Sequence, residues 1–404
     1  MDPSGLDTAT ARRFEAYLDT IGATLRDKRQ RASFATYAAG LLSDGARKSM
    51  EPMAARASTD PALTSAIHHR LIHFLGSAAW KDAPVRTAAA RYAVDELERH
   101  GSISTWIIDD TGFLKQGKRS PGVQRQYTGS AGKRANCQIG VSLVLANERA
   151  EVPVDFKLYI PQSWADDRKR CRAAHIPDDV GGESKWELAL DMIESAVETE
   201  LPRGVVLADS AYGHNGGFRE RLEELGLDFA VDLKSNASVR RVGSKGRLGK
   251  PTSVKALARR HVSKFKEATW REGTKGPVRG RVLRMRVVTA ESQYRKQSKP
   301  MWLLIEWPER DENPMNYVIS NLSEKMPLEE MLNICGNRWR IERSYQDLKG
   351  QLGLDHYEGR SFVGWHHHVS VALVCYAFLV AERARSFSPS GTITHAGRAL
   401  KDAA

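Results

Sequence analysis

Three carboxylates occupy positions from which they could bind divalent metal ions. Asp109 and Asp209 each end a short β-type run, and Glu342 lies in a stretch with helical periodicity. Oxygen ligands with no His or Cys nearby in sequence favour Mg²⁺ or Mn²⁺ over zinc. The chemistry typical of such a set is two-metal phosphoryl transfer. A single Asp after a strand is more often a turn or a helix cap, so the prediction depends on all three together.

Positive charge is concentrated in one segment between the second and third of these carboxylates. The chain has 404 residues with 61 Lys+Arg and 49 Asp+Glu, a net charge of +12. Residues 233–300 hold 20 of the cations and three acids, so this segment carries +17 and the remainder −5. A segment this basic is typical of a site for a polyanion, and its position favours nucleic acid over a membrane surface.

The sequence lacks the patterns of membrane, secreted, disulfide-rich and zinc-binding proteins. No apolar run approaches the roughly 20 residues of a membrane span, and the first 13 residues lack the pattern of a secretory signal. The four cysteines are widely spaced, which indicates reduced thiols and neither a disulfide framework nor a zinc site. We therefore expect a cytoplasmic protein.

The elements that must position the carboxylates follow from hydrophobic periodicity. Residues 1–100 read as a helical N-terminal domain, either a DNA-binding domain or a solubilising or dimerising bundle. Residues 101–232 alternate strands with helices, which predicts the first part of a mixed α/β (α+β) catalytic core. Its expected strands are 104–111, 135–145, 152–159, 204–209 and 229–233, and its expected helices are 184–199 and 217–225.

The second half of the chain returns to the same core after an interruption. Residues 233–312 are predicted to form a basic, β-rich insertion, with strands at 278–288 and 301–307 and arginines on one face of the first. Residues 313–385 form the second part of the core, with a strand at 315–320 and helices at 327–351 and 366–385. Residues 386–404 are a C-terminal tail.

Two motifs resemble those of a known family. The run Trp106-Ile107-Ile108-Asp109-Asp110-Thr111 resembles the W-x-x-D-x-T strand of RNase H-like integrases and transposases, which favours Asp109 over Asp110. Cys335, Arg338, Glu342 and Lys349 have the spacing of the Y-x2-R-x3-E-x6-K signature of DDE transposases of the cut-and-paste insertion-sequence group. Cysteine stands where that signature has tyrosine.

The resemblance implies a function and a site. Asp109, Asp209 and Glu342 would hold two Mg²⁺ (or Mn²⁺) ions in an RNase H-like core. The enzyme would cleave transposon ends and join their 3′-hydroxyls to target DNA, as a homodimer on paired terminal inverted repeats. Expected DNA contacts are Arg338, Lys349, Lys115, Lys118, Arg119, Arg281, Arg284 and Arg286.

The same resemblance implies that a flipped base would stack on an aromatic side chain of a strand before the signature helix. The candidates are Tyr317, Trp302 and Trp307, and for each one alone an ordinary core position is the preferred interpretation. The triplet His366-His367-His368 is interpreted as structural or phosphate-facing, and not as a metal site.

Two other functions remain open at this point. One is a metal-dependent nuclease of the same fold without strand transfer, which would cut DNA but not join it. The other is a domesticated, non-catalytic DNA-binding protein, which would retain salt-sensitive binding alone.

Overall fold

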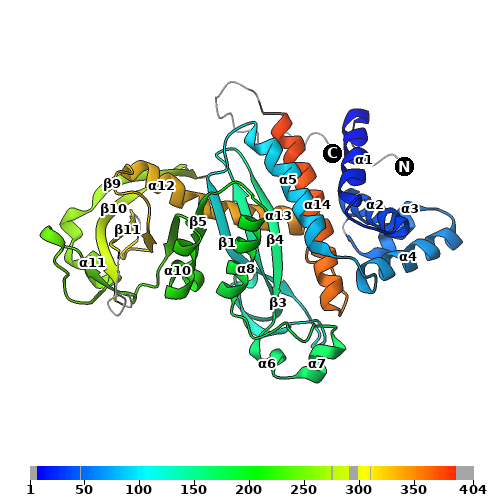
Figure 1. Ribbon diagram of the computed structural model, residues 1–404, viewed down its shortest axis with the longest axis horizontal. Helices are drawn as coiled ribbons and strands as arrows, with labels where there is room; N and C mark the ends of the chain where they lie inside the picture. The colour runs from blue at the N-terminus through cyan, green and yellow to red at the C-terminus, as the bar shows by residue number, and fades with distance from the viewer. Residues whose placement is uncertain (1–6, 46, 274–275, 291–298, 310, 388–404) are drawn as a thin grey trace.

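The computed structural model describes residues 7–45, 47–273, 276–290, 299–309 and 311–387. A mixed sheet lies in the middle of an elongated molecule, with the N-terminal helices at one end and the basic insertion at the other (Figure 1). The predicted α/β class is confirmed. The predicted C-terminal tail lies almost entirely outside the described residues.

The central strands have the order and directions of an RNase H-like core. In space the order is β4-β3-β1-β5-β6. The β1, β3 and β4 strands form an antiparallel meander, while β5 and β6 run parallel to β1. These strands are β1 (Thr105–Leu114), β3 (Lys133–Ala146), β4 (Glu151–Tyr159), β5 (Val205–Ala208) and β6 (Phe229–Asp232).

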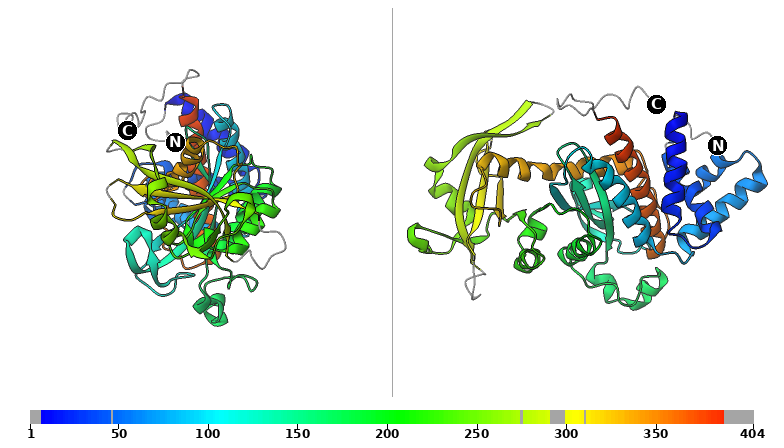
Figure 2. Two further views of the ribbon diagram at one scale, coloured as in Figure 1. Left: turned by 90° about the vertical axis from the view of Figure 1, so that its left-hand side faces the viewer. Right: turned by 45° about the horizontal axis from the view of Figure 1, so that its top comes forward.

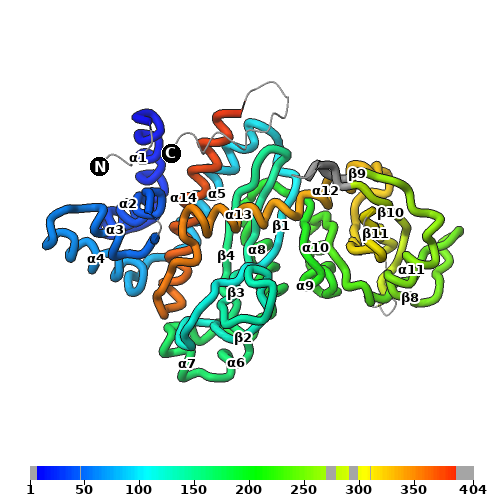
Figure 3. The backbone as a smooth tube through the Cα atoms, turned by 180° about the vertical axis from the view of Figure 1, so that it is seen from behind, coloured from blue at the N-terminus to red at the C-terminus, as the bar shows by residue number. Residues whose placement is uncertain are grey.

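Helices cover both faces of this sheet. One face packs against α8 (Lys185–Glu198), whose predicted capping box between Ser184 and Glu187 is present. The opposite face packs against α13 (Arg340–Gly350) and α14 (Phe362–Arg385), which lie nearer the viewer in Figure 3. Smaller elements of the core are β2 (Gln124–Thr128), α6 (Gln162–Ala165), α7 (Arg168–Ala173), α9 (Ser210–Gly213) and α10 (Gly216–Glu224).

The insertion extends the core sheet. Strand β12 (Asn316–Ser320) pairs with core strand β6 on one side and with insertion strand β11 (Met301–Pro308) on the other. The sheet continues through β10 (Gly276–Thr289), and Figure 2 shows the insertion standing away from the core helices. The remaining insertion elements are β7 (Ser238–Arg241), β8 (Thr252–Ser253), β9 (Lys266–Gly273) and α11 (Val254–Arg260), a helix that the sequence reading did not include.

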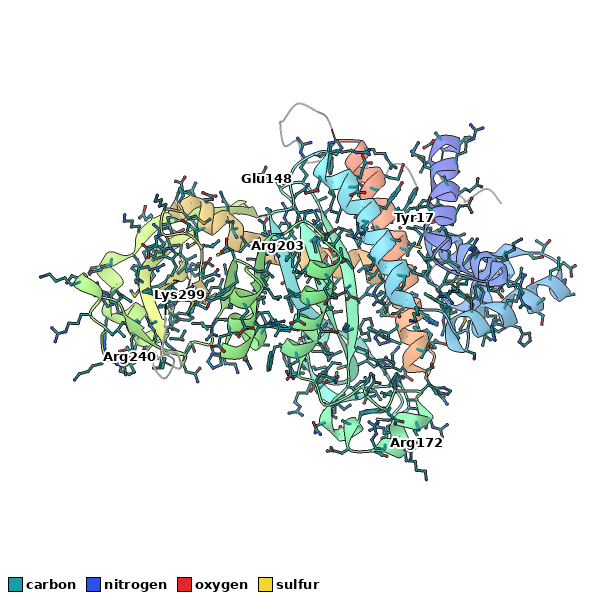
Figure 4. All side chains as sticks on the ribbon, in the orientation of Figure 1. Tyr17, Glu148, Arg172, Arg203, Arg240 and Lys299 are labelled. Carbon is teal, nitrogen blue, oxygen red and sulfur yellow. The ribbon has the colours of Figure 1, made fainter. Side chains whose placement is uncertain are left out.

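The predicted helical N-terminal segment is packed onto the core. Its helices are α1 (Thr8–Gly22), α2 (Lys28–Leu42), α3 (Met50–Ala57), α4 (Pro61–Gly76) and α5 (Asp82–Glu98). The hydroxyl of Tyr17, labelled in Figure 4, donates to the Val374 carbonyl at 2.8 Å. Arg13 pairs with Glu382 at 2.5 Å. Helix α14 therefore packs between the N-terminal helices and the sheet, and it joins the two.

Helix α14 also corrects one expectation. By length and composition it could cross a membrane, although the sequence reading found no such run. Most of its apolar stretch is buried inside the molecule, and Val371, Val374 and Phe378 are fully enclosed. The apolar composition is thus that of a core helix, which must be hydrophobic on nearly all sides.

Candidate active site

Asp109 and Asp209 lie side by side because two parallel strands are in register. Ile108 on β1 pairs with Ala208 on β5, and each is followed directly by its Asp. Neighbouring strands are about 4.8 Å apart, so the two carboxylates meet at one edge of the sheet. The sequence could predict an Asp directly after each apolar run, although β1 continues past Asp109 to Leu114, and the strand register brings the two together.

The Asp109 carboxyl is only partly accessible and lies close to other negative charges. Burial, then the charge of Asp209, then that of Asp110, raises its pKa to about 7. The backbone N–H of Asp110 donates to its Oδ1 at 2.7 Å. The positive charge of Arg338 does not fully offset the repulsion between Asp109 and its neighbouring carboxylates.

Asp110 points to the other face of the sheet. Its carboxylate accepts from Lys185 at 2.8 Å, at the start of α8, and from the Tyr212 hydroxyl at 3.3 Å. Adjacent residues of a strand face opposite sides. This geometry agrees with the preference for Asp109 over Asp110 as the metal-facing residue.

Asp209 both follows strand β5 and caps the next helix. It follows β5 and also caps helix α9, where its Oδ1 accepts from the Ala211 N–H at 2.8 Å. The helix-cap interpretation is therefore correct for Asp209. A cap uses one carboxylate oxygen, and the other remains available at the edge of the sheet.

The signature residues span two helices and the turn that joins them. The expected helix 327–351 is divided into α12 (Leu328–Gly336), a 3₁₀ turn at Asn337–Trp339, and α13. Backbone angles at Asn337, Trp339 and Arg340 are all right-handed helical, so the direction is kept through the turn. Arg338 lies in the turn, and Glu342 lies in the first turn of α13.

Arg338 connects the signature helix to the strand-end carboxylates. Its Nη1 is 3.9 Å from Asp109 Oδ2, and its Nε is 3.5 Å from Asp232 Oδ2. The charges of Asp232, Asp109, Asp209 and Glu342 outweigh its burial and raise the guanidinium pKa. All three predicted catalytic residues thus act electrostatically on one cation, the Arg338 guanidinium. The Glu342 side chain is exposed and makes no hydrogen bond or salt bridge with the described part of the chain.

The donors present suit a hard divalent cation. All three side chains are carboxylates, and the excess negative charge at Asp109 and Asp209 is what such a cation would offset. Within the described ranges, no three His, Cys, Asp or Glu side chains are already grouped as a metal site. Glu342 is therefore not grouped with the aspartate pair in this arrangement of the described residues.

The Lys349 side chain was expected to face a phosphate, but it is hydrogen-bonded within the protein. Its ammonium donates to Thr111 Oγ1 at 2.8 Å, to the Gly112 carbonyl at 2.8 Å and to Ser130 Oγ at 3.0 Å. These three bonds use every donor of a lysine. In this structure Lys349 fastens the end of α13 to β1.

The basic loop after β1 lines an open cavity of about 860 Å³. Lys118 and Arg119 are exposed there, whereas Lys115 is half-buried and donates to the Tyr357 carbonyl at 2.6 Å. Arg47 from the α2–α3 connection and Arg360 from beyond α13 also line this cavity. It is the place where the predicted loop cations meet the N-terminal helices.

The insertion arginines do not share one face, which corrects the expected arrangement. The Arg281 guanidinium lies 4.5 Å from the Trp307 ring centroid, while Arg284 and Arg286 lie 4.4 Å and 4.7 Å from that of Trp302. A spacing of three along a strand changes the face, because strand side chains alternate with period two.

The aromatic candidates differ in accessibility. Tyr317 is 3% exposed and its hydroxyl donates to the Pro314 carbonyl at 3.3 Å, so its ring is part of the core. Trp302 and Trp307 are partly exposed, and each carries arginine on its ring as described above. Both indole N–H groups donate to backbone carbonyls, Trp302 to Ser323 and Trp307 to Asp311.

Sequence reasoning missed two residues of this region. Asp232 ends β6 in the run Phe229-Ala230-Val231-Asp232, the same pattern that drew attention to the other two aspartates. Tyr345 on α13 bonds Ser142 at 2.7 Å, and Ser142 is the strand partner of Asp109. No sequence signal marked Tyr345, because its partner lies about 200 positions away.

The histidine triplet is structural. Both ring nitrogens of His367 lie within 3.0 Å of backbone carbonyls, those of Leu75 and Trp80. His368 lies between the Tyr37 hydroxyl at 2.7 Å and the Leu354 carbonyl at 3.1 Å. These side chains join α14 to the N-terminal helices.

The order and directions of the central strands are those of an RNase H-like fold, with two aspartates side by side on neighbouring parallel strands. The sequence model of the DDE superfamily endonucleases matches residues 20–277, more than half of the chain, and the chain belongs to this family. The match includes Asp109 and Asp209, whereas Glu342 lies beyond it.

A named relative agrees with this assignment. The chain is 26% identical over 358 residues to the probable transposase for insertion sequence element IS701 of Microchaete diplosiphon. The similarity covers 86% of this chain and 83% of the relative. The prediction of a DDE-type insertion-sequence transposase is confirmed.

Proposed function

We propose that this transposase cleaves DNA at the ends of its element and joins the resulting 3′-hydroxyls to target DNA. The observation that supports this most is the pairing of Ile108 with Ala208, which sets Asp109 beside Asp209 at the edge of an RNase H-like sheet. Arg338 adds a cation at the same edge, and Glu342 follows it by four residues.

Asp109, Asp209 and Glu342 would hold two Mg²⁺ or Mn²⁺ ions. When bound, such ions activate the attacking hydroxyl and stabilise the leaving oxygen of the phosphodiester. Asp209 is kept in place by its cap bond to α9, and Asp109 by its central strand. Glu342 on α13 would supply the third carboxylate, while Arg338 would orient a phosphate next to the pair.

The partner would be double-stranded DNA, as terminal inverted repeats and as target. The exposed cations of the insertion, among them Arg247, Lys250 and Lys299, would provide the phosphate contacts. Cutting and joining two ends together requires two active sites, so a homodimer on paired ends follows from the function. A cytoplasmic location, with DNA-bound protein at the nucleoid, follows from the substrate.

The products of one reaction distinguish this function from its alternatives. Duplexes carrying the ends of the element that encodes the chain would be incubated with the protein and Mg²⁺, and sized on a denaturing gel. We expect cleaved ends and, with a target plasmid present, joined strands; EDTA should abolish both. Cutting without joining would identify a nuclease. Binding without either would identify a non-catalytic DNA-binding protein.

A further inference from the structure

A third carboxylate stands at the same edge of the sheet as the proposed metal-binding pair. Ile108 on β1 pairs with Ala208 on β5, and Ala208 pairs with Val231 on β6, so the next residues of the three strands, Asp109, Asp209 and Asp232, stand at one level of the sheet. Three neighbouring parallel strands therefore each lead into an aspartate at this level. The side chain of Asp232 is 19% exposed, which matches the 20% of Asp109.

The partner of Asp232 is Arg338. The Asp232 Oδ2 lies 3.5 Å from Arg338 Nε, whereas the contact between Arg338 Nη1 and Asp109 is looser, at 3.9 Å. One end of the guanidinium is thus held by Asp232, and the other end is turned toward the proposed metal ligands. Arginine presents its donors in a rigid planar fork, so fixing the Nε end also fixes the direction of the others.

This contact also bears on the placement of Glu342. Arg338 lies in the 3₁₀ turn directly before α13, and Glu342 lies one helical turn beyond it. Holding Arg338 against the end of β6 therefore holds the start of α13 over the strand ends. Side chains that orient reacting groups in this way can change rates by about 100-fold when a group is misplaced by 1 Å.

We propose that Asp232 is a positioning residue of the active site, which holds Arg338 beside the Asp109–Asp209 pair and keeps it there when cations and DNA bind. This inference rests on the proposed function. In the free protein the guanidinium faces Asp109. Once a divalent cation takes that carboxylate, the looser contact is lost, and Asp232 retains Arg338 at a distance from which its remaining donors reach a phosphate.

The test is a double-mutant cycle in the full-length protein. Asp232→Asn, Arg338→Ala and the double variant would be compared in single-turnover cleavage of an end duplex, with DNA and Mg²⁺ each titrated. We expect each single variant to be slower by about tenfold to 100-fold. The double variant should be no more than about threefold slower than Arg338→Ala, because both changes remove one interaction. Asp228→Asn, an exposed aspartate just before β6, is the matched control and should cleave normally.

The Mg²⁺ titration separates positioning from metal binding. The Mg²⁺ concentration for half-maximal rate should change by less than about twofold in Asp232→Asn, since only Arg338 is displaced. Binding of the same duplex in EDTA, measured by anisotropy, should weaken equally in Asp232→Asn and Arg338→Ala. Additive losses in the cycle, or a Mg²⁺ requirement raised as in Asp209→Asn, would overturn the inference.

The outcome is independent of the proposed function itself, which fails if Asp109→Asn cleaves at the wild-type rate. Should thermal unfolding show that Asp232→Asn has lost its fold, Asp232→Glu takes its place, because it keeps the ion pair. The inference then requires Asp232→Glu to cleave at least about tenfold faster than Arg338→Ala, and equal rates would refute it.

Discussion

Lys349 shows that a residue can match a motif and still have all its donors occupied. Its three bonds to Thr111, Gly112 and Ser130 join α13 to β1. We predict that Lys349→Met lowers the free energy of unfolding by about 1.5–3 kcal/mol, because it leaves these acceptors without a charged donor. Urea unfolding would measure this, with Lys169→Met, an exposed lysine of α7, as control. Equal effects of the two substitutions would contradict the structural role.

His368 predicts a pH dependence of stability. The Leu354 carbonyl can only accept, so the His368 Nε2 carries a proton, and Nδ1 accepts from the Tyr37 hydroxyl. Burial lowers the His368 pKa from 6.5 to about 4. The unfolded chain therefore binds a proton below pH 6.5 that the folded chain does not, and stability is lost as the pH falls from 6.5 toward 4.

The size of this effect at pH 5 is about 2 kcal/mol for one histidine. The difference in unfolding free energy between pH 7 and pH 5 should shrink by this amount in His368→Gln. His69→Gln, an exposed histidine of α4, should leave the difference unchanged. An unchanged difference in His368→Gln would show that the side chain is not neutral in the folded protein.

At this scale the sequence predicted what stands in a local pattern. Asp109 and Asp209 were found because each follows an apolar strand, and Arg338 and Glu342 because their spacing resembles a signature. The partnership of Arg338 with Asp232 depends on pairing between β5 and β6, which no local pattern encodes. Tyr345 was missed for the same reason.

At the scale of elements, the contact between α9 and β6 aligns the carboxylate-bearing strands. A Cβ added at Gly213 would lie 2.5 Å from the Asp232 carbonyl oxygen and 2.7 Å from Val231 Cβ. We predict that Gly213→Ala costs about 1–3 kcal/mol of stability and slows cleavage, because α9 and the end of β6 must separate.

The control for this substitution is Gly350→Ala. Gly350 is the last residue of α13, and an added Cβ there meets no atom within 4 Å. Thermal unfolding and end cleavage of the two variants would be compared directly. Equal melting temperatures and equal rates would show that the close approach of α9 to β6 has no bearing on the site.

Most elements were predicted because periodicity is a local property. The core strands and α8 were found within two or three residues at most ends. The distribution of the β10 arginines was wrong, because a spacing of three places residues on opposite faces of a strand. The break at Asn337–Trp339 was missed because the residues there continue a helical pattern.

At the scale of the whole molecule, the basic insertion accounts for the positive charge. We predict that replacing four of its exposed cations, Arg247, Lys250, Arg259 and Arg260, with Gln reduces the salt dependence of DNA binding. Each lost phosphate contact lowers the slope of log K against log salt by about 0.9. Anisotropy titrations at salt concentrations from about 50 to about 200 mM would measure this slope.

The matched variant replaces Arg12, Arg26, Lys169 and Arg172, which are exposed and spread over other elements. Its slope should stay closer to that of the wild type. If the two variants lose the same slope, DNA binding follows net charge and not the insertion.

Contacts between distant segments cross the predicted domain boundaries, and the sequence could not predict them. A change in composition near residue 101 predicted a separate N-terminal domain, whereas Arg13 and Tyr17 are bonded to α14 near the other end of the chain. Strand β12 likewise belongs to both the core and the insertion. Such contacts join distant segments, and only the folded chain shows them.

The central claim is that Asp109, Asp209 and Glu342 act as one metal site. Its most direct test is the rate at which Asp109→Asn, Asp209→Asn and Glu342→Gln cleave an end duplex in saturating Mg²⁺, with Glu330→Gln, an exposed carboxylate of α12, as control. We predict that each of the first three loses at least about 1,000-fold in rate, a barrier increase of about 4 kcal/mol, while binding DNA and remaining folded. Cleavage by any of the three at the rate of the control would contradict the claim.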